Sequence, residues 1–181
     1  MIEFGSRRAN ECKDIPFILA VEDNFDNELR IVVALPVKGE KGTGMDDIED
    51  QKLKEILKES YPVYPDENNR YEIVFPSYIV YQMRNESYTV WDGDELCEGK
   101  YFTIYKKSKL LDQVEKITIA RQFEDGSCYP EKWLHYGIHA QNHVLDVISS
   151  EKPVIKRLKP AADPKSGIWR KWKSLWTSHA R

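Results

Sequence analysis

Residues 133–149 read WLHYGIHAQNHVLDVIS, and the conformation of this stretch decides the fold of the chain. His135, His139 and His143 recur at every fourth position, so a helix would place their imidazoles on one face, where they could bind a transition metal. Gly137 would weaken such a helix, and the β-branched residues near the end of the stretch favour strands. We therefore predict a β-hairpin that turns at the central Gln-Asn pair.

This predicted hairpin divides its side chains between two faces. A core face is made of Tyr136, Ile138, Ala140, Leu145 and Val147, and the other face carries His135, Gly137, His139, Val144, Asp146 and Ile148. Cross-strand neighbours lie close together, so His135, His139 and Asp146 can form a polar cluster. Such a set suits a metal site or an acid–base pair, because a carboxylate orients an imidazole and raises its basicity. The alternative is an ordinary polar, solvent-facing side of a sheet.

Other strand-like segments are rich in β-branched and aromatic residues. They lie at residues 15–21, 28–37, 71–91 and 101–105, and the third divides into YEIVF, YIVYQM and SYTVW. The first two predict an antiparallel hairpin. Polar stretches that contain Gly, Pro or Asn predict loops at residues 38–44, 61–70, 92–100 and 122–132.

Two segments have apolar residues at helical spacing. One spans residues 45–60, and we expect Thr43 or Asp46 to cap it. The other follows Ser108, the expected N-cap, and its apolar positions are Leu110, Leu111, Val114 and Ile117.

These elements predict an α+β fold. We expect an antiparallel sheet of about six to eight strands, with a strongly curved or barrel-like sheet as an alternative. Two main helices would lie on one side of it. Residues 1–159 would form a single α+β domain, and residues 160–181 a basic, Trp-rich tail. The 181 residues are 41% hydrophobic and 31% charged, a composition typical of globular domains.

Charge is unevenly distributed along the chain. Residues 151–181 hold 9 Lys and Arg against 2 Asp and Glu, so the first 150 residues hold 18 basic and 28 acidic side chains. Three cysteines without CxxC spacing, a polar start of the chain and the lack of a long apolar run lead us to expect a cytoplasmic protein without a transmembrane segment.

The tail contains an amphipathic pattern. Three indoles at helical spacing alternate with basic residues: Trp169, Trp172 and Trp176 with Arg170, Lys171 and Lys173. Such a helix can dock on its own domain or on a partner protein, or can contact nucleic acid or an anionic membrane surface. Docking on protein is the favoured interpretation, because a short isolated helix is marginally stable.

The remaining motifs are weak. The loop KGEKGTG (38–44) lacks the residue order of a phosphate-binding loop, and the acidic residues after it would repel a phosphate. The loop DGDELCEG (92–99) lacks the order of a calcium loop. Glu86 lies at a predicted turn, where it is a conceivable acid or base. No cofactor is predicted.

Within residues 71–155 the chain resembles a set of short uncharacterised bacterial proteins. The resemblance is carried by NESY (85–88), YKKS (105–108) with LLD (110–112), HYG (135–137), and NHV (142–144) with DV (146–147). It implies a bacterial origin and a compact α+β domain, and it brings no catalytic residues.

Three functions are compatible with these patterns. The first is a non-enzymatic protein-binding module, adaptor- or immunity-like, with an acidic surface. The second is a metal-dependent or acid/base hydrolase that uses His135, His139 and Asp146, with Glu86 nearby. The third is a protein that contacts a membrane surface or nucleic acid through its tail.

Overall fold

The computed structural model describes residues 2–6, 14–44 and 48–160, and within them the strands form two main antiparallel sheets. The four-stranded sheet has the order β1-β2-β3-β11 and consists of β1 (Phe17–Asp23), β2 (Leu29–Lys38), β3 (Val63–Phe75) and β11 (Val154–Arg157). The five-stranded sheet has the order β4-β10-β9-β6-β5 and consists of β4 (Tyr78–Asn85), β10 (His143–Ser149), β9 (Leu134–His139), β6 (Phe102–Lys107) and β5 (Leu96–Glu98).

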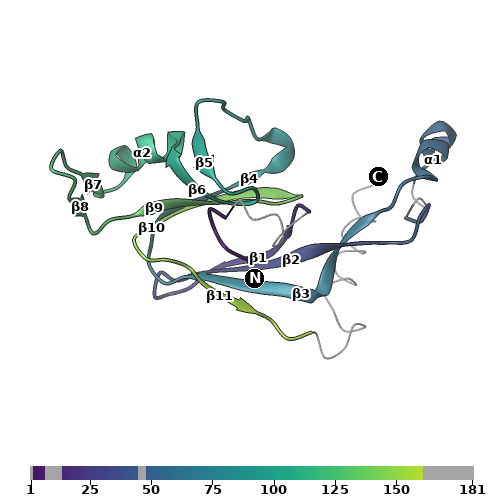
Figure 1. The fold of residues 1–181 in the computed structure, drawn as a ribbon, viewed down its shortest axis with the longest axis horizontal. Coiled ribbons are helices and arrows are strands. Elements are labelled where there is room, and N and C mark those ends of the chain that lie inside the picture. The colour runs from purple at the N-terminus through teal and green to yellow at the C-terminus, as the bar shows by residue number, and fades with distance from the viewer. Residues whose placement is uncertain (1, 7–13, 45–47, 161–181) are drawn as a thin grey trace.

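The two sheets lie face to face and the main core fills the space between them (Figure 1). Its fully buried side chains come from both sheets and include Leu29, Ile31, Ile73, Phe75, Ile138, Leu145 and Val147. Each such side chain contributes about 2 kcal/mol by leaving water. The α+β class is thus confirmed, whereas the expected single sheet is divided into two layers. In the described residues each main sheet keeps two edge strands, so the barrel-like alternative does not hold.

The hairpin at the centre of the five-stranded sheet forms as predicted. Strands β9 and β10 pair in antiparallel register, with Asp146 opposite Gly137 and Ile148 opposite His135. Residues 141–142 make the turn, which the hydrogen bond from the Ala140 N–H to the His143 carbonyl closes at 2.9 Å. The helical alternative for this stretch is therefore wrong.

Helix α2 (Lys109–Ile117) covers part of the outer face of the five-stranded sheet (Figure 1). Its buried residues Leu110 and Val114 pack with Ile148 and Val80 in a second, smaller core. The cap is the predicted one, because Ser108 Oγ accepts from the Leu111 N–H at 3.1 Å.

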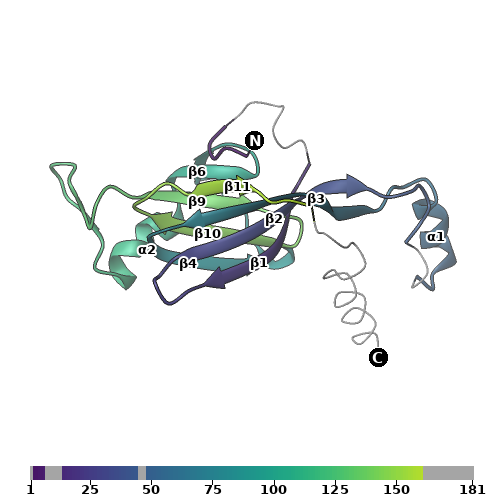
Figure 2. The same ribbon diagram turned by 90° about the horizontal axis from the view of Figure 1, so that it is seen from below.

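Helix α1 (Gln51–Leu57) is shorter than predicted and has no buried residue. It lies at the tip of an arm that the ends of β2 and β3 carry beyond the sandwich (Figure 2). Its N-cap is Asp50, which accepts from the N–H groups of Lys52 and Leu53. The expected cap Thr43 is therefore wrong, and Asp46 lies outside the described residues.

Several predicted loops contain short strands. The prediction of a loop over residues 61–70 is wrong, because β3 begins at Val63 and pairs with the far end of β2, Pro36 opposite Pro65. The predicted loop at residues 92–100 contains the short strand β5. The predicted loop at residues 122–132 contains β8 (Cys128–Tyr129) and the second residue of β7 (Arg121–Gln122). Conversely, SYTVW is not a strand: Glu86–Tyr88 form a 3-10 helix, η1, which Asn85 caps.

Neither described helix has the length and apolar character that crossing a bilayer requires. The amphipathic pattern of the tail, with Trp169, Trp172, Trp176, Arg170, Lys171 and Lys173, lies outside the described residues.

Candidate functional site

The outer face of the five-stranded sheet has an apolar half under α2 and a polar half beside it. Strand alternation places Gln82 and Arg84 of β4 on the same face as Asp146, because the register sets Gln82 opposite Asp146. Ile148 lies two residues after Asp146 and opposite His135, so His135 of β9 is on this face as well. Tyr105 of β6 lies opposite His135 and therefore shares the face. The sequence pattern of four adjacent strands therefore gathers the polar groups.

Asp146 is the centre of the polar half. Its side chain is only 2% exposed, and its two oxygens lie near three donors. Oδ1 lies 3.0 Å from His135 Nε2, and Oδ2 lies 2.7 Å from Arg84 Nη2 and 3.2 Å from Gln82 Nε2. A buried carboxylate persists as an ion only when it is paired in this way.

The hydrogen bonds assign the protons of His135. The ionised carboxylate of Asp146 can only accept, so His135 Nε2 carries a proton and donates to Asp146 Oδ1 at 3.0 Å. In the neutral ring, Nδ1 then accepts from the Ser108 hydroxyl at 2.7 Å, while Ser108 Oγ also accepts from the Leu111 N–H. Both ring nitrogens are thus occupied by groups of the protein.

Two opposing effects set the pKa of Asp146. Burial alone would raise the pKa, but the hydrogen bond from His135 and the positive charge of Arg84 outweigh it. The pKa of Asp146 therefore lies below its usual value. Asp146 is ionised at neutral pH and neutralises the guanidinium of Arg84.

Tyr105 packs flat on His135 and connects the network to His139. The Tyr105 and His135 rings are stacked with centroids 4.2 Å apart, and the Tyr105 hydroxyl lies 3.0 Å from His139 Nε2. Gly137 makes room for this arrangement, because a Cβ there would lie 2.5 Å from Thr103 Oγ1 and 2.8 Å from Tyr105 Cε2. Burial lowers the pKa of His139, so its imidazole is neutral at pH 7.

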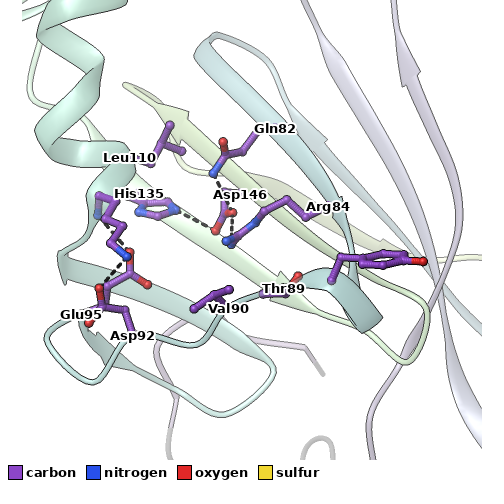
Figure 3. A pocket seen from close by; sticks show the side chains of 11 residues that line it. Gln82, Arg84, Thr89, Val90, Asp92, Glu95, Leu110, His135 and Asp146 are labelled. Atoms are coloured by element: carbon purple, nitrogen blue, oxygen red, sulfur yellow. Dashed lines mark hydrogen bonds and ion pairs between the residues drawn. The ribbon is translucent and has the colours of Figure 1, made fainter.

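A cavity of about 260 Å³ opens beside this network (Figure 3). His135, Asp146 and Gln82 lie at its back, and Arg84 reaches in from one side. The opposite side holds the ion pair of Asp92 with Lys109 and the carboxylate of Glu95. The lip is formed by Tyr88 at the end of η1 and by Thr89 and Val90 after it. In that ion pair Lys109 Nζ lies 2.7 Å from Asp92 Oδ2.

Ser108, His135 and Asp146 follow one another in the order of a hydrolase triad, but they are not built to act as one. The nucleophile of a triad must reach a substrate. Ser108 is 1% exposed, caps α2 with the same oxygen, and is not among the residues that line the cavity. The three side chains instead join the helix to the sheet.

The structure brings together only part of the predicted site. His135 and Asp146 are in direct contact, whereas His139 joins them only through Tyr105. Glu86 does not line the cavity, and its backbone N–H donates to the Asn142 carbonyl at 3.4 Å. Among the residues that the structure describes, no three His, Cys, Asp or Glu side chains are arranged to hold a metal ion. The expectation of a solvent-facing polar surface is wrong for His135 and Asp146, both of which are buried.

Sequence reasoning missed Gln82 and Arg84. The signal was present in YIVYQMR (78–84), where polar residues at 82 and 84 continue the alternation that Val80 begins. Ser108 was found as a helix cap, but its second bond, to His135, depends on the position of α2 over the sheet.

No family model matches the chain, and neither does any curated protein or solved structure.

Proposed function

We propose that the protein is a non-enzymatic binding module whose partner, a protein, docks on the segment formed by residues 88–91. The observation that carries the proposal is the exposure of three apolar side chains there: Tyr88 is 86% exposed, Val90 78% and Trp91 57%. Exposed apolar groups gathered on one segment are typical of interaction sites, and Tyr and Trp are enriched where binding energy concentrates.

The segment is held in place before any partner arrives. Asn85 Oδ1 accepts from the Ser87 N–H at 3.0 Å, and the Thr89 hydroxyl donates to the Asn85 carbonyl at 3.0 Å. The indole of Trp91 lies 5.1 Å from the His139 ring, measured between centroids. A segment that is already ordered loses little conformational entropy on binding, which favours affinity.

The buried network supports this proposal over a hydrolase. A general base must face the substrate or a nucleophile that reaches it, whereas His135 is 2% exposed and its Nδ1 faces Ser108, which is 1% exposed and does not line the cavity. The buried network of Ser108, His135 and Asp146 therefore serves as a rigid support for the exposed segment. The excess of acidic side chains in residues 1–150 further suits a partner with a basic surface, as in adaptor or immunity proteins.

Affinity capture from a native lysate with the full chain tests the proposal. Tyr88→Ala/Trp91→Ala should reduce recovery of a stoichiometric partner by about tenfold or more, since loss of one anchor residue typically costs over 1 kcal/mol. The matched control is Phe25→Ala/Ile119→Ala, which removes two side chains that are 100% and 75% exposed elsewhere. Equal recovery by the two double variants would contradict the proposal.

The metal-dependent version of the hydrolase alternative has its own test. Elemental analysis of the purified protein and melting curves with zinc or manganese should give neither bound metal nor a raised melting temperature. A stoichiometric metal that His135→Gln removes would favour the hydrolase instead.

A further inference from the structure

Helix α1 has an apolar side that the described residues leave exposed. Leu53 and Ile56 are 42% and 71% exposed and lie three positions apart, so they share one side of the helix. An isolated helix of seven residues is unstable in water, because most helical stability in proteins comes from the packing of an apolar side. We therefore expect another segment to cover Leu53 and Ile56.

The described chain leaves the sandwich beside the arm and runs towards it. Strand β11 pairs antiparallel with β3, and Arg157 lies opposite Tyr71. The Leu158 N–H continues this pairing and donates to the Arg70 carbonyl at 2.9 Å. Because β3 leads from the arm into the sandwich, β11 leads back towards the arm (Figure 2). The described chain thus ends at the base of the arm, with 21 residues after Pro160.

The length of the tail is sufficient for its Trp-rich part to reach α1. Residues 161–168 can span up to about 28 Å when extended, and residues 168–176 would add about 13 Å as a helix. The stretch of β3 from the base of the arm at Arg70 to its start at Val63 covers only about 23 Å. The tip of the arm is therefore within reach, whereas the β7–β8 hairpin lies at the opposite end of the molecule (Figure 1).

The tail and the arm have complementary compositions. Residues 161–181 hold 5 Lys and Arg against 1 Asp, whereas residues 39–62 hold 7 Asp and Glu against 4 Lys. Their net charges of +4 and −3 have opposite signs and favour contact between the two segments. The three indoles of the tail recur at helical spacing and offer a large apolar area to Leu53 and Ile56.

We infer that the tail folds back on the arm of its own chain, so that Trp169, Trp172 and Trp176 pack on the side of α1 that carries Leu53 and Ile56. Two short amphipathic segments, each marginally stable alone, then stabilise each other. Attachment to one chain gives an effective concentration on the order of 1 mM, so a modest intrinsic affinity is sufficient. The inference does not depend on the protein partner proposed above.

Nuclear Overhauser effects in the full chain test this inference. The sample carries ¹³C-labelled Ile and Leu methyl groups and protonated Trp rings in a deuterated background. The methyls of Leu53 and Ile56 should show contacts to indole protons of the tail, which single Trp→Phe variants assign. Ile119, which is 75% exposed two residues before β7, is the control and should show none. No contact at either Leu53 or Ile56, or the same contacts at Ile119, would overturn the inference.

A mixed sample separates docking within one chain from docking on a second copy. Half of the chains carry only the labelled methyl groups, and the other half carry only the protonated Trp rings. The contacts should disappear in this sample, because each tail then lies on the arm of its own chain. Contacts that persist would place the tail on a second copy and would overturn the inference.

Limited proteolysis of the full chain measures the docked population independently. Trypsin cleaves after the Lys and Arg residues within 168–176 only while the tail is undocked, so the cleavage rate follows the open population. Leu53→Ser/Ile56→Ser should raise this rate at least about threefold, because it removes the apolar contacts of α1. The matched control is Ile119→Ser/Phe123→Ser, whose side chains are 75% and 51% exposed. Equal rates in the two double variants would overturn the inference.

Discussion

Asp146 is the residue on which the polar half of the sheet depends. It receives bonds from three side chains on two neighbouring strands, and one of them, His135, is buried with it. Asp146→Ala should lower the free energy of unfolding by about 3 kcal/mol, because it leaves a guanidinium and a buried imidazole N–H without an acceptor. Urea denaturation measures the change, and Asp26→Ala at the exposed β1–β2 turn is the control. A loss below about 1 kcal/mol would mean that water replaces the carboxylate.

The ionisation of Asp146 predicts a pH dependence of stability. Its pKa in the folded protein lies below its usual value, because the bonds from His135 and Arg84 outweigh burial. An unfolded Asp titrates near pH 3.9, so the folded state binds this proton less tightly than the unfolded state. The contribution is therefore complete above about pH 5 and is lost as the pH falls through 3.9 towards the folded pKa.

Asp146→Asn isolates this contribution from those of other carboxylates. Between about pH 6 and pH 3.5 the wild-type chain should lose more unfolding free energy in urea than the variant does. Equal losses in the two proteins would contradict the ionised, paired state of Asp146.

At the scale of elements, the contact between α2 and the sheet depends on Ser108. The same hydroxyl caps the helix and donates to His135 Nδ1. Ser108→Ala should lower the free energy of unfolding by about 2–4 kcal/mol, since it removes a cap and leaves a buried acceptor unpaired. The control is Asn85→Ala, which removes the exposed cap of η1 and should cost only about 1 kcal/mol. Similar losses in the two variants would show that the bond to His135 adds nothing.

The sequence predicted elements well wherever local patterns determine them. The β9–β10 hairpin follows from its alternation, and α2 follows from its spacing and from Ser108. Residues 61–70 were misread, because their prolines and polar residues are typical of loops, whereas pairing with the end of β2 makes part of them a strand. SYTVW was misread for the opposite reason: its residues follow Asn85 in a mostly exposed segment, and none of the described strands pairs with them.

Only the part of the candidate site that lies within one local pattern could be predicted from the sequence. His135 and Asp146 share a hairpin, so alternation alone placed them together. Arg84 and Ser108 reach them from β4 and from the start of α2, and no local pattern shows which elements become neighbours. The burial of the network depends on the position of α2 and could not be read from the strands.

At the scale of the whole molecule, the arm is separable from the sandwich. Helix α1 has no buried residue, and Leu53 and Ile56 are 42% and 71% exposed. Because Lys38 pairs with Val63, an Asn-Gly turn can replace residues 39–62 and close the hairpin directly. Thermal unfolding of this variant should differ from wild type by less than about 4 °C, since little apolar surface is lost. A fall of more than about 10 °C would show that the arm packs on the body.

Residues 1–150 have an excess of acidic side chains and residues 151–181 an excess of basic ones, so any binding to an anionic surface is expected to depend on the tail. Deletion of residues 161–181 removes the Trp-rich basic segment, which lies outside the described residues. If the tail contacts membranes or nucleic acid, the full chain should bind anionic vesicles or an oligonucleotide more tightly than the deletion variant does, and added salt should weaken the binding. Equal binding by both chains would leave docking on protein as the role of the tail.

Photo-crosslinking from position 88 tests the proposed binding surface most directly. A benzophenone amino acid in place of Tyr88 should give one crosslinked species of defined mass in a native lysate, because the side chain is 86% exposed. The same amino acid in place of Phe25, which is 100% exposed at the β1–β2 turn, should not give that species. The same products from both positions, or none from position 88, would contradict a binding role for the segment above the cavity.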